Sequence, residues 1–356
     1  MNPRKRITIK DIARESGVSS ETVSRVINNH PDVSLKTLEK VHEVISRLGY
    51  SPNAVARRLV QKRSCMIGIA ASIYEFQGAS GMAVVGVQQE ANSNGYSVTL
   101  QLLHHPETTE VEEILNNFIA ERVDGIIWAV PEIGNNRSWF KDNQSKLRMP
   151  IVFLNMQPYP GLNVVSIDNR QGGRIATEHL LQNGYRNIGF IAGPEDWWEV
   201  RERRLGWQDA LSSYGILPEE RQIARGGTWM PDGGERGMQM LLDQYPEVEA
   251  VFTCNDYIAL GTLKVAYQHG LHVPQDFAIV GFDNLLEAAY YLPSLTTVHH
   301  QITEVGSLAM RELGRLIDAE QSGKSISPPG AITLHPLLIV RESSLPKTII
   351  KTTGVV

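Results

Sequence analysis

The sequence predicts an α+β protein of several domains, with an N-terminal three-helix head containing a helix-turn-helix, a hinge helix, and two α/β lobes. Apolar residues in the first fifty positions recur at helical spacing and are interrupted by glycines. From residue 66 onward, short apolar runs alternate with amphipathic stretches, which is typical of parallel sheets covered by helices on both faces. The alternation comes in two similar series, so we expect two similarly built lobes.

The charge of the chain is distributed unevenly along its 356 residues, 42% of which are hydrophobic as in ordinary globular proteins. Residues 1–63 carry 13 Lys and Arg against 6 Asp and Glu, a net charge of +7. The remainder carries 21 against 33, a net charge of −12, so the total of −5 conceals a basic front end. A basic head attached to an acidic body fits a tethered domain that binds double-stranded DNA.

The cysteines and apolar runs indicate a cytoplasmic protein. Cys65 and Cys254 lie far apart without a Cys-x-x-Cys pattern, which argues against a disulfide scaffold or a zinc site and fits a reducing compartment. The basic stretch 1–6 is followed by charge rather than by the apolar core of an export signal, and no window approaches the length of a membrane span.

The head begins with two short helices. Thr8 and Asp11 have the spacing of a capping box for the first helix, and Gly17 stops it because glycine takes the left-handed conformation without steric cost. Ser19 is the expected N-cap of the second helix. In that helix Val23, Val26 and Ile27 share one face, and the opposite face is polar: Ser20, Glu21, Ser24, Arg25 and Asn28.

The polar face of the second helix is a candidate reader of base pairs. Arg25 can donate two parallel bonds to guanine, and Glu21 can accept from cytosine, so together they could read a G·C pair. A solvated helix face would look the same in isolation, and the spacing of the two helices therefore carries the interpretation. A third helix, capped by Ser34 and ended by Gly49, closes the head, and a short helix is expected after Pro52.

This segment resembles the head and hinge of the lactose-repressor (LacI/GalR) family. The resemblance rests on four runs: Ile9-Lys10-Asp11-Ile12-Ala13, Gly17-Val18-Ser19, Thr22-Val23-Ser24-Arg25-Val26-Ile27-Asn28 and Ser51-Pro52-Asn53-Ala54-Val55-Ala56-Arg57. It implies that the DNA contacts come from Ser20, Glu21, Thr22, Arg25 and Asn28 in the head, and from Asn53, Ala56 and Leu59 in the hinge. Leu59 would wedge into the minor groove. The alternative is that it packs against its own head, but the flanking Arg57, Arg58, Lys62 and Arg63 favour the wedge.

Behind the head, we expect two strand series. The first contains strands at 66–71, 97–102, 125–128 and 151–154, with helices near 82–94, 108–121 and 136–147. The second contains strands at 164–167, 188–192, 250–253 and 278–282. The expected division is a head at 1–50, a hinge and linker at 51–63, two lobes at 64–342 and a tail at 343–356. Lobe 1 would hold about 64–163 and 295–327, and lobe 2 about 164–294 and 328–342.

Two such lobes usually enclose a ligand at the carboxyl ends of their strands. The side chains expected there are amides, carboxylates and a guanidinium, together with tryptophans: Ser72, Asn155, Trp197, Trp198, Arg203, Trp229, Asn255, Asp256, Asp283 and Asn284. Planar polar groups that grip adjacent hydroxyls and indoles that cover a ring suit a sugar. The alternative is structural, because Asn255 and Asp256 could simply cap a helix and tryptophans often fill a core.

The resemblance to the lactose-repressor family extends over residues 7 to about 342. It implies lobes of periplasmic-binding-protein-like (type I) architecture, in which Arg203, Asn255 and Asp283 bind the polar groups of the effector and Trp229 stacks on its ring. Ser72, Asn155 and Trp197 are effector candidates because of their places at the ends of the predicted strands. Three features depart from the family pattern and leave the particular effector open: Asn155 in place of an aspartate, Ile302 in place of an aromatic, and the pair Trp197-Trp198. A sugar is the expected effector, and a purine or nucleoside is the alternative.

No enzyme, cofactor or metal site is expected. There is no P-loop, and Gly233-Gly234-x-x-Gly237 lacks the first half of a dinucleotide fingerprint. The pairs His104-His105 and His299-His300 are adjacent residues, for which solvated side chains are the simpler interpretation. A two-lobed solute-binding protein would share the lobes but would need an export signal and would not use a basic head. The resemblance instead implies a homodimeric bacterial repressor, cytoplasmic and associated with the nucleoid when bound to a pseudo-palindromic operator.

Overall fold

The computed structural model describes residues 7–27, 32–50, 63–72, 81–104, 111–143, 149–323 and 330–345. The chain divides into two compact units, a head (Met1–Ser64) and a core unit (Cys65–Val356). The predicted hinge helix lies outside the described residues. Within those residues, no helix is both long enough and apolar enough to cross a membrane.

The head consists of the three predicted helices, α1 (Ile9–Ser16), α2 (Ser20–Ile27) and α3 (Leu35–Leu48). The predicted ends are confirmed: the backbone N–H of Thr8 donates to Asp11 Oδ2 at 3.0 Å, and Gly17 has a φ of 64°. Ser19 Oγ accepts from the backbone N–H of Thr22 at 3.0 Å. Because α2 buries Val23 and Val26 completely against the other two helices, its polar side chains are left on the outside.

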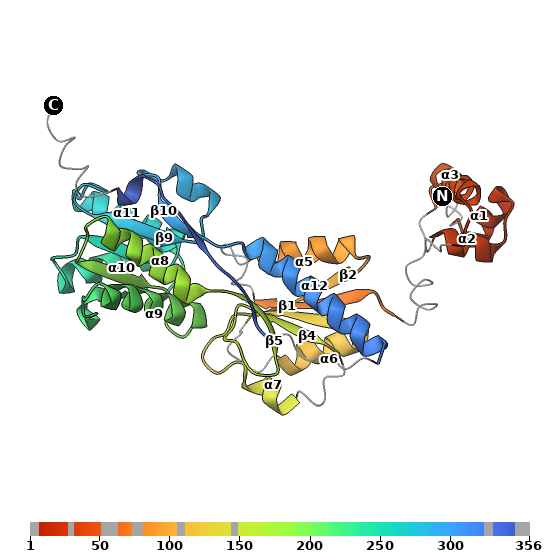
Figure 1. Ribbon diagram of the computed structural model, residues 1–356, viewed down its shortest axis with the longest axis horizontal. Helices are drawn as coiled ribbons and strands as arrows, with labels where there is room; N and C mark the ends of the chain where they lie inside the picture. Colours follow the sequence, from red (N-terminus) through yellow and green to blue (C-terminus); the bar gives the residue numbers. More distant parts are fainter. Residues whose placement is uncertain are drawn as a thin grey trace, which may run out of the picture. The chain divides into compact units, whose positions relative to one another are not determined.

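The first lobe of the core unit is a parallel six-stranded sheet with the strand order β11-β5-β4-β3-β1-β2 (Figure 1). Its strands are β1 (Met66–Ser72), β2 (Ser97–Leu103), β3 (Gly125–Ala129), β4 (Ile151–Leu154), β5 (Asn163–Ile167) and β11 (Ile332–Leu334). Helices α5 (Gly81–Ser93) and α12 (Ile302–Gln321) lie side by side on one face. Helices α6 (Val111–Glu121) and α7 (Ser138–Asn143) cover the other face.

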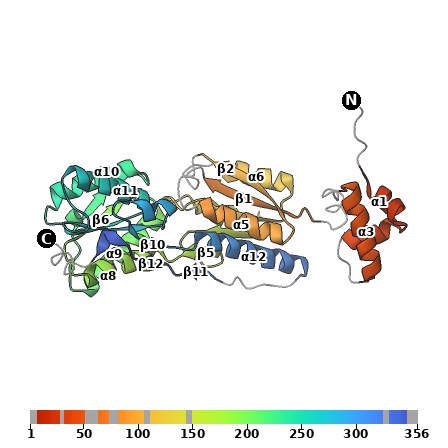
Figure 2. The same ribbon diagram turned by 90° about the horizontal axis from the view of Figure 1, so that it is seen from above.

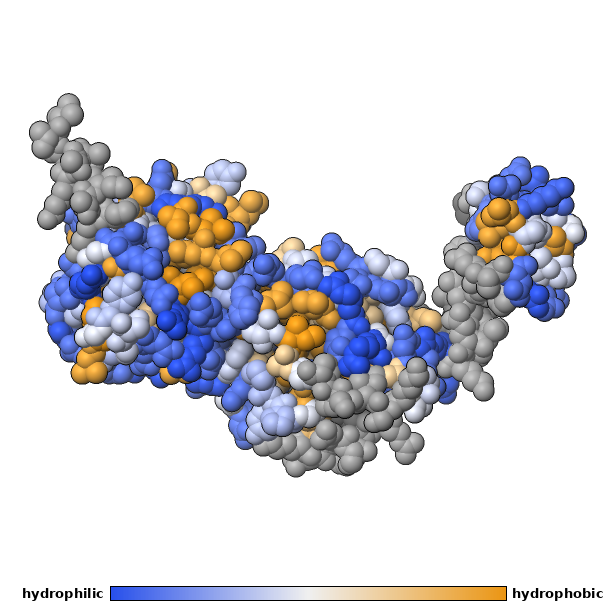
Figure 3. Space-filling view, viewed as in Figure 1, coloured by the Kyte–Doolittle hydropathy of each residue, from blue (hydrophilic) through white to orange (hydrophobic). Residues whose placement is uncertain are grey.

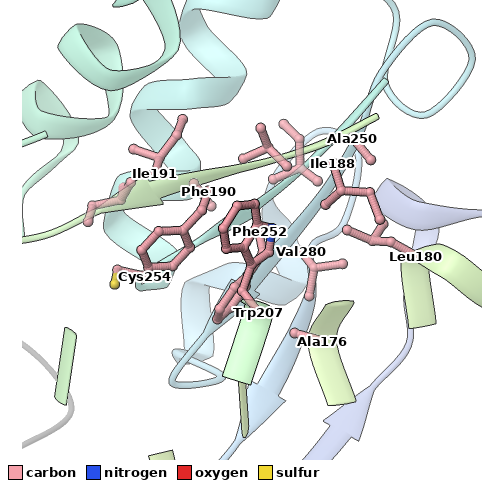
Figure 4. Close-up of a cluster of buried hydrophobic side chains, with 14 of the residues drawn as sticks. Ala176, Leu180, Ile188, Phe190, Ile191, Trp207, Ala250, Phe252, Cys254 and Val280 are labelled. Carbon is pink, nitrogen blue, oxygen red and sulfur yellow. The ribbon is translucent and has the colours of Figure 1, made fainter. Parts of the chain in front are cut away.

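The second lobe repeats this plan with the strand order β12-β10-β9-β8-β6-β7. Its strands are β6 (Ile188–Ala192), β7 (Ile223–Arg225), β8 (Ala250–Thr253), β9 (Ala278–Phe282), β10 (Thr296–His299) and β12 (Leu337–Ile339), which alone runs antiparallel to its neighbour. Helices α8 (Asn169–Gln182) and α9 (Trp198–Ser213) cover one face, and α10 (Pro231–Gln244) and α11 (Asp256–Gln268) the other (Figure 2). The core between sheet and helices contains Phe190 stacked on Trp207 with ring centroids 5.9 Å apart (Figure 4).

The chain crosses between the lobes three times, and the predicted lobe boundaries are wrong at three strands. β5 and β11 both belong to the first sheet, although both were expected in the second lobe. β10 belongs to the second sheet although it was assigned to the first lobe. The pattern of apolar residues identifies a strand but carries no information about its neighbour, which depends on where the chain crosses.

The predicted tail is also shorter than expected. Ser343 and Ser344, in the 3₁₀ helix Glu342–Ser344, are completely buried. Ser343 Oγ donates to the carbonyl of Ile279 at 2.7 Å, and Asn183 Nδ2 donates to the carbonyl of Ser344 at 2.9 Å. Hydroxyl side chains in this segment complete the edge of the second lobe, so it is part of the core unit.

Each of three helix pairs is in backbone contact through a pair of glycines. On α5 and α12, a Cβ added at Gly86 would lie 1.9 Å from Thr303 O, and one added at Gly306 would lie 1.9 Å from Ala83 O. The same reciprocal contact joins the other two pairs, through Gly173 and Gly206 on α8 and α9, and through Gly234 and Gly261 on α10 and α11. The helices of each pair can approach this closely only because no side chain separates them.

Candidate functional site

The polar face of α2 is accessible. Glu21 and Arg25 are exposed, Ser20 and Thr22 are half-buried, and Arg25 Nη2 lies 3.0 Å from Glu21 Oε1. A contact between Arg25 and a base would therefore replace an exposed ion pair, which costs little. The other predicted DNA contacts, Asn28, Asn53, Ala56 and Leu59, lie outside the described residues.

In both sheets the strand order reverses at the same relative place, between β1 and β3 in the first lobe and between β6 and β8 in the second. Open parallel sheets bind ligands outside the carboxyl ends of the strands at such a reversal. The segments that follow these strands are therefore the candidate binding residues. They include Glu132 after β3, Trp197 after β6 and Asn255 after β8, together with Ser72, the last residue of β1.

A buried charged cluster lies at this edge of the second lobe. Arg203, on α9, is 6% exposed; its Nε donates to Asn169 Oδ1 at 2.9 Å, and its Nη1 donates to the carbonyl of Cys254. Its Nη1 is 3.8 Å from Asp283 Oδ1, which also lies 3.0 Å from His300 Nε2. Arg203 is thus fixed in place by the protein, and Asp283 is the group that it orients.

The interpretation of His299-His300 as solvated side chains is wrong for His300, which is 5% exposed. Successive residues of an extended chain point to opposite sides, and at the end of β10 this places the second histidine of the pair on the buried side. His300 lies at a crossing between the lobes. His300 is therefore an effector candidate that the sequence did not identify.

Two tryptophans, Trp197 and Trp229, lie beside this cluster. The rings of Trp197 and Trp229 meet edge to face with centroids 5.3 Å apart, and the Arg203 guanidinium carbon is 5.6 Å from the Trp229 ring. A Cβ at Gly193 would lie 3.1 Å from the Trp229 ring, so glycine there leaves room for the indole. The Nε1 of Trp229 is buried and has no hydrogen-bond partner in the described part of the chain. The Trp229 indole therefore offers a flat apolar ring, and its Nε1 is a donor available to a ligand.

Asn255 and Asp256 have structural partners. Asn255 Oδ1 caps α11 by accepting from Ile258 N at 2.8 Å, and its Nδ2 donates to the carbonyl of Trp229 at 3.0 Å. Asp256 accepts from Thr297 Oγ1 at 2.6 Å and from Leu285 N at 2.8 Å. Burial, reinforced by the charge of Asp283, raises the pKa of Asp256 well above its usual value. Asn255 therefore positions Trp229, and Asp256 holds the segment that follows Asp283.

The first lobe contributes Ser72 and Asn155. Ser72 is completely buried at the end of β1. Asn155 follows β4 with a φ of 43°, a conformation that asparagine tolerates better than most residues. Its Oδ1 is buried and is not hydrogen-bonded to any of the residues described. This amide is thus available to a ligand.

The two lobes meet along a short seam formed by residues 132–134 of the first lobe and 196–199 of the second. Trp198 N donates to the carbonyl of Glu132 at 3.0 Å, and Gly134 N donates to the carbonyl of Asp196 at 3.0 Å. Glu132 Oε2 accepts from Gln157 N at 2.8 Å. Nothing in the spacing of the sequence identifies Glu132 or Glu199 as a site residue. Only the reversal of strand order between β1 and β3 could have indicated the loop after β3, which contains Glu132.

A cavity of about 510 Å³ opens beside the charged cluster. It is lined by segments 283–286 and 299–304 and by Met82 of α5, and it includes Asp283 and His300. This volume lies in the range of small-molecule pockets. No group of His, Cys, Asp or Glu side chains suited to a metal ion occurs among the residues that the structure describes.

Comparison with known proteins finds a matching family for each of the two units. The family "Bacterial regulatory proteins, lacI family" matches residues 8–53, and the "Periplasmic binding protein-like domain" matches residues 177–344. The transcriptional repressor PurR of Glaesserella parasuis serovar 5 (strain SH0165) is 33% identical over 339 residues, covering 94% of this chain and 98% of the relative.

Solved structures resemble the whole chain. The lac repressor dimer bound to operator and the anti-inducer ONPF superposes with a TM-score of 0.78 at 30% identity, covering 96% of this chain and 100% of that one. A complex of the transcriptional regulator CelR with cellobiose gives a TM-score of 0.68 at 29% identity, covering 95% and 100%. The chain therefore belongs to the lacI family of DNA-binding bacterial transcription regulators.

Proposed function

We propose that this regulator responds to an uncharged sugar, which binds between the two lobes and changes the affinity of the head for its operator. The observation that carries the proposal is the buried group of Arg203, Asp283 and His300 beside the Trp229 ring. Charged planar groups bind adjacent hydroxyls in pairs, and an indole covers the apolar side of a sugar ring. The solved CelR relative, whose complex contains cellobiose, agrees with this ligand class.

The proposed roles follow from this arrangement. Asp283, Asn155, Trp197 and Trp229 contact the sugar, while Arg203 and Asn255 orient Asp283 and Trp229, and Ser72 closes the first-lobe side. In the head, Ser20, Glu21, Thr22, Arg25 and Asn28 contact the major groove, and Asn53, Ala56 and Leu59 the minor groove. A ligand that favours one arrangement of the lobes biases the segments leading to the head. A coupling of about 2 to 3 kcal/mol would change operator affinity by roughly thirtyfold to more than a hundredfold.

The direct test is the melting temperature of the full chain with neutral mono- and disaccharides, sugar phosphates and purine bases. A ligand at a hundred times its dissociation constant stabilises the folded state by about 2.7 kcal/mol, which is measurable. The sugar that raises the melting temperature should also change operator affinity. If only purines do so, the flat Trp229 ring holds a base and a purine-responsive regulator replaces this proposal.

We expect Arg25→Ala to weaken binding to an operator selected from random DNA by about 1 to 3 kcal/mol, because a bidentate contact to guanine is lost. Binding to a scrambled duplex should change little. Fluorescence anisotropy at one fixed salt concentration measures both affinities. Arg47→Ala is the matched control, because it removes the same charge from α3, where Arg47 pairs with Glu15 at 3.0 Å. Equal losses for Arg25→Ala on both duplexes would show that Arg25 contacts only phosphate.

We also propose a homodimer formed through apolar surface on the lobes. Figure 3 shows hydrophobic residues gathered on the face of the core unit in view. On the second lobe Leu292 is 92% exposed, and Leu286 and Tyr290 are nearly as exposed. Leu292→Glu should leave the fold intact and shift the protein from dimer to monomer, because a charge cannot be buried unpaired at an interface. Sedimentation velocity measures this shift, and an unchanged dimer would exclude this surface.

A further inference from the structure

We propose that Glu199 selects the effector, because its carboxylate accepts a hydrogen bond from a hydroxyl of an uncharged sugar and rejects anionic sugars. The inference deepens the proposed function and rests on it. Glu199 lies in the first turn of α9, four residues before Arg203, so the two side chains share one face of the helix. It is also at the seam, directly after Trp198, whose backbone N–H contacts Glu132.

The observation that points to a ligand is a buried oxygen without a partner. Glu199 Oε2 is buried and accepts no hydrogen bond from any described residue. Leaving a buried acceptor unsatisfied costs about 1 to 3 kcal/mol, and more when it is charged, so such atoms are rare unless something else occupies them. Trp229 Nε1 and Asn155 Oδ1 are unsatisfied in the same way. One donor and two acceptors would match the mixed hydrogen bonding of a polyhydroxylated ring that reaches all three atoms.

The neighbouring cations already have acceptors. Arg203 donates to Asn169 and Cys254, and Arg201 Nη1 donates to the carbonyl of Asp196 at 2.8 Å while its Nη2 lies 3.9 Å from Glu132. Arg137, the third cation that acts on Glu199, donates through its Nη atoms to Asn136 Oδ1 and to the carbonyl of Val130. None of these donors satisfies Glu199 Oε2, and the partner that this oxygen lacks is a donor. A phosphate or carboxylate on the ligand would instead bring a like charge next to Glu199, Glu132 and Asp283.

The same surroundings predict the pH dependence of sugar binding. Burial raises the pKa of Glu199 to about 7; Glu132 adds to the rise, and Arg203 and Arg137 oppose it. A carboxylate accepts a stronger hydrogen bond from a hydroxyl than a protonated carboxyl does. Sugar affinity should therefore increase from about pH 6 to about pH 8 as Glu199 ionises. This increase should be absent in Glu199→Gln, which keeps the shape but does not titrate.

The test compares the full chain with Glu199→Ala, Glu199→Gln and Glu202→Ala, the last being a matched control on the same helix. The probes are glucose, galactose, cellobiose and lactose, together with glucose 6-phosphate, galactose 6-phosphate, glucuronate, guanine and hypoxanthine. We expect a neutral sugar to raise the melting temperature and its anionic counterpart to have no effect. Glu199→Ala should weaken sugar affinity at least tenfold, because a hydrogen bond to a charged group is lost. Glu199→Gln should keep part of the affinity, and Glu202→Ala all of it.

The outcomes separate the two proposals. Equal sugar affinity in Glu199→Ala and the unchanged chain would overturn the role of Glu199 and leave sugar sensing intact. A larger response to the anionic sugars would overturn both the role of Glu199 and the uncharged character of the proposed effector, and would leave only a sugar as the ligand class. If no sugar shifts the melting temperature, whether or not a purine does, both the sugar function and the selection by Glu199 are overturned. The unliganded melting temperatures of the variants show whether a lost response reflects unfolding.

Discussion

Arg203→Ala should lower the free energy of unfolding of the core unit by about 3 to 5 kcal/mol, the range for removing one partner of a buried ion pair. The substitution leaves Asn169 Oδ1 and the carbonyl of Cys254 without their donor, and Asp283 without its nearest cation. It also removes the guanidinium from the Phe282 ring, whose centroid is 3.6 Å from the guanidinium carbon. Urea unfolding of the full chain, followed by tryptophan fluorescence, measures the loss.

Arg170→Ala is the matched control for this prediction. Arg170 also carries a short ion pair, 2.6 Å from Asp209, but the two side chains are 51% and 37% exposed. Exposed pairs contribute about 0 to 1 kcal/mol because water and salt screen them. Similar losses in the two variants would mean that Arg203 stabilises the protein through its charge alone and does not organise the cluster.

Gly306→Ala should destabilise the core unit by about 3 kcal/mol or more. The added methyl would overlap the carbonyl oxygen of Ala83 at 1.9 Å, and backbone atoms cannot rotate out of the way as a side chain can. α5 and α12 must then separate. The free energy lost by separating them should exceed the typical cost of overpacking a core. The midpoint of urea unfolding, compared with that of the unchanged chain, gives the size of the effect.

We expect Gly314→Ala, on the same helix, to raise the stability of the core unit. A Cβ at Gly314 would have no neighbour within 4 Å, so the new methyl meets open space. Alanine is a better helix former than glycine by about 0.5 to 1 kcal/mol, and this variant should be more stable by that amount. If Gly306→Ala were as stable as Gly314→Ala, the helix pair would not be in backbone contact at this place.

Local features were predictable because the residues that determine them are adjacent in sequence. Thr8 with Asp11, Gly17 and Ser19 fix the ends of α1 and α2 within a few positions, and the structure has each end where the pattern predicts it. The strands of the lobes were found for the same reason. β7, β11 and β12 were not, since three residues are too few to establish a period, and β10 was not because three of its four residues are polar.

Features that depend on contacts between distant segments were not predictable. β5 has the same apolar pattern whichever sheet it joins, and its membership follows from the crossings. Of the candidate effector residues, Arg203 and Asp283 were found because they come after predicted strands, and the family resemblance supports both. Glu199 and His300 were missed because nothing in the sequence distinguishes them from other glutamates and histidines. Only their burial in the folded chain identifies them as candidates.

The three crossings have a consequence for how the protein is made. The first lobe needs α12 and β11, at residues 302–334, and these are synthesised after all but the last strand of the second lobe. Domains usually fold in the order in which they leave the ribosome, but here the second lobe can assemble most of its sheet before the first is complete. Until α12 emerges, the nascent chain exposes the apolar face of β3, β4 and β5 on which Val305 and Leu313 later pack. The growing chain therefore exposes an apolar surface that the finished protein buries, and such surface makes a nascent chain prone to aggregation.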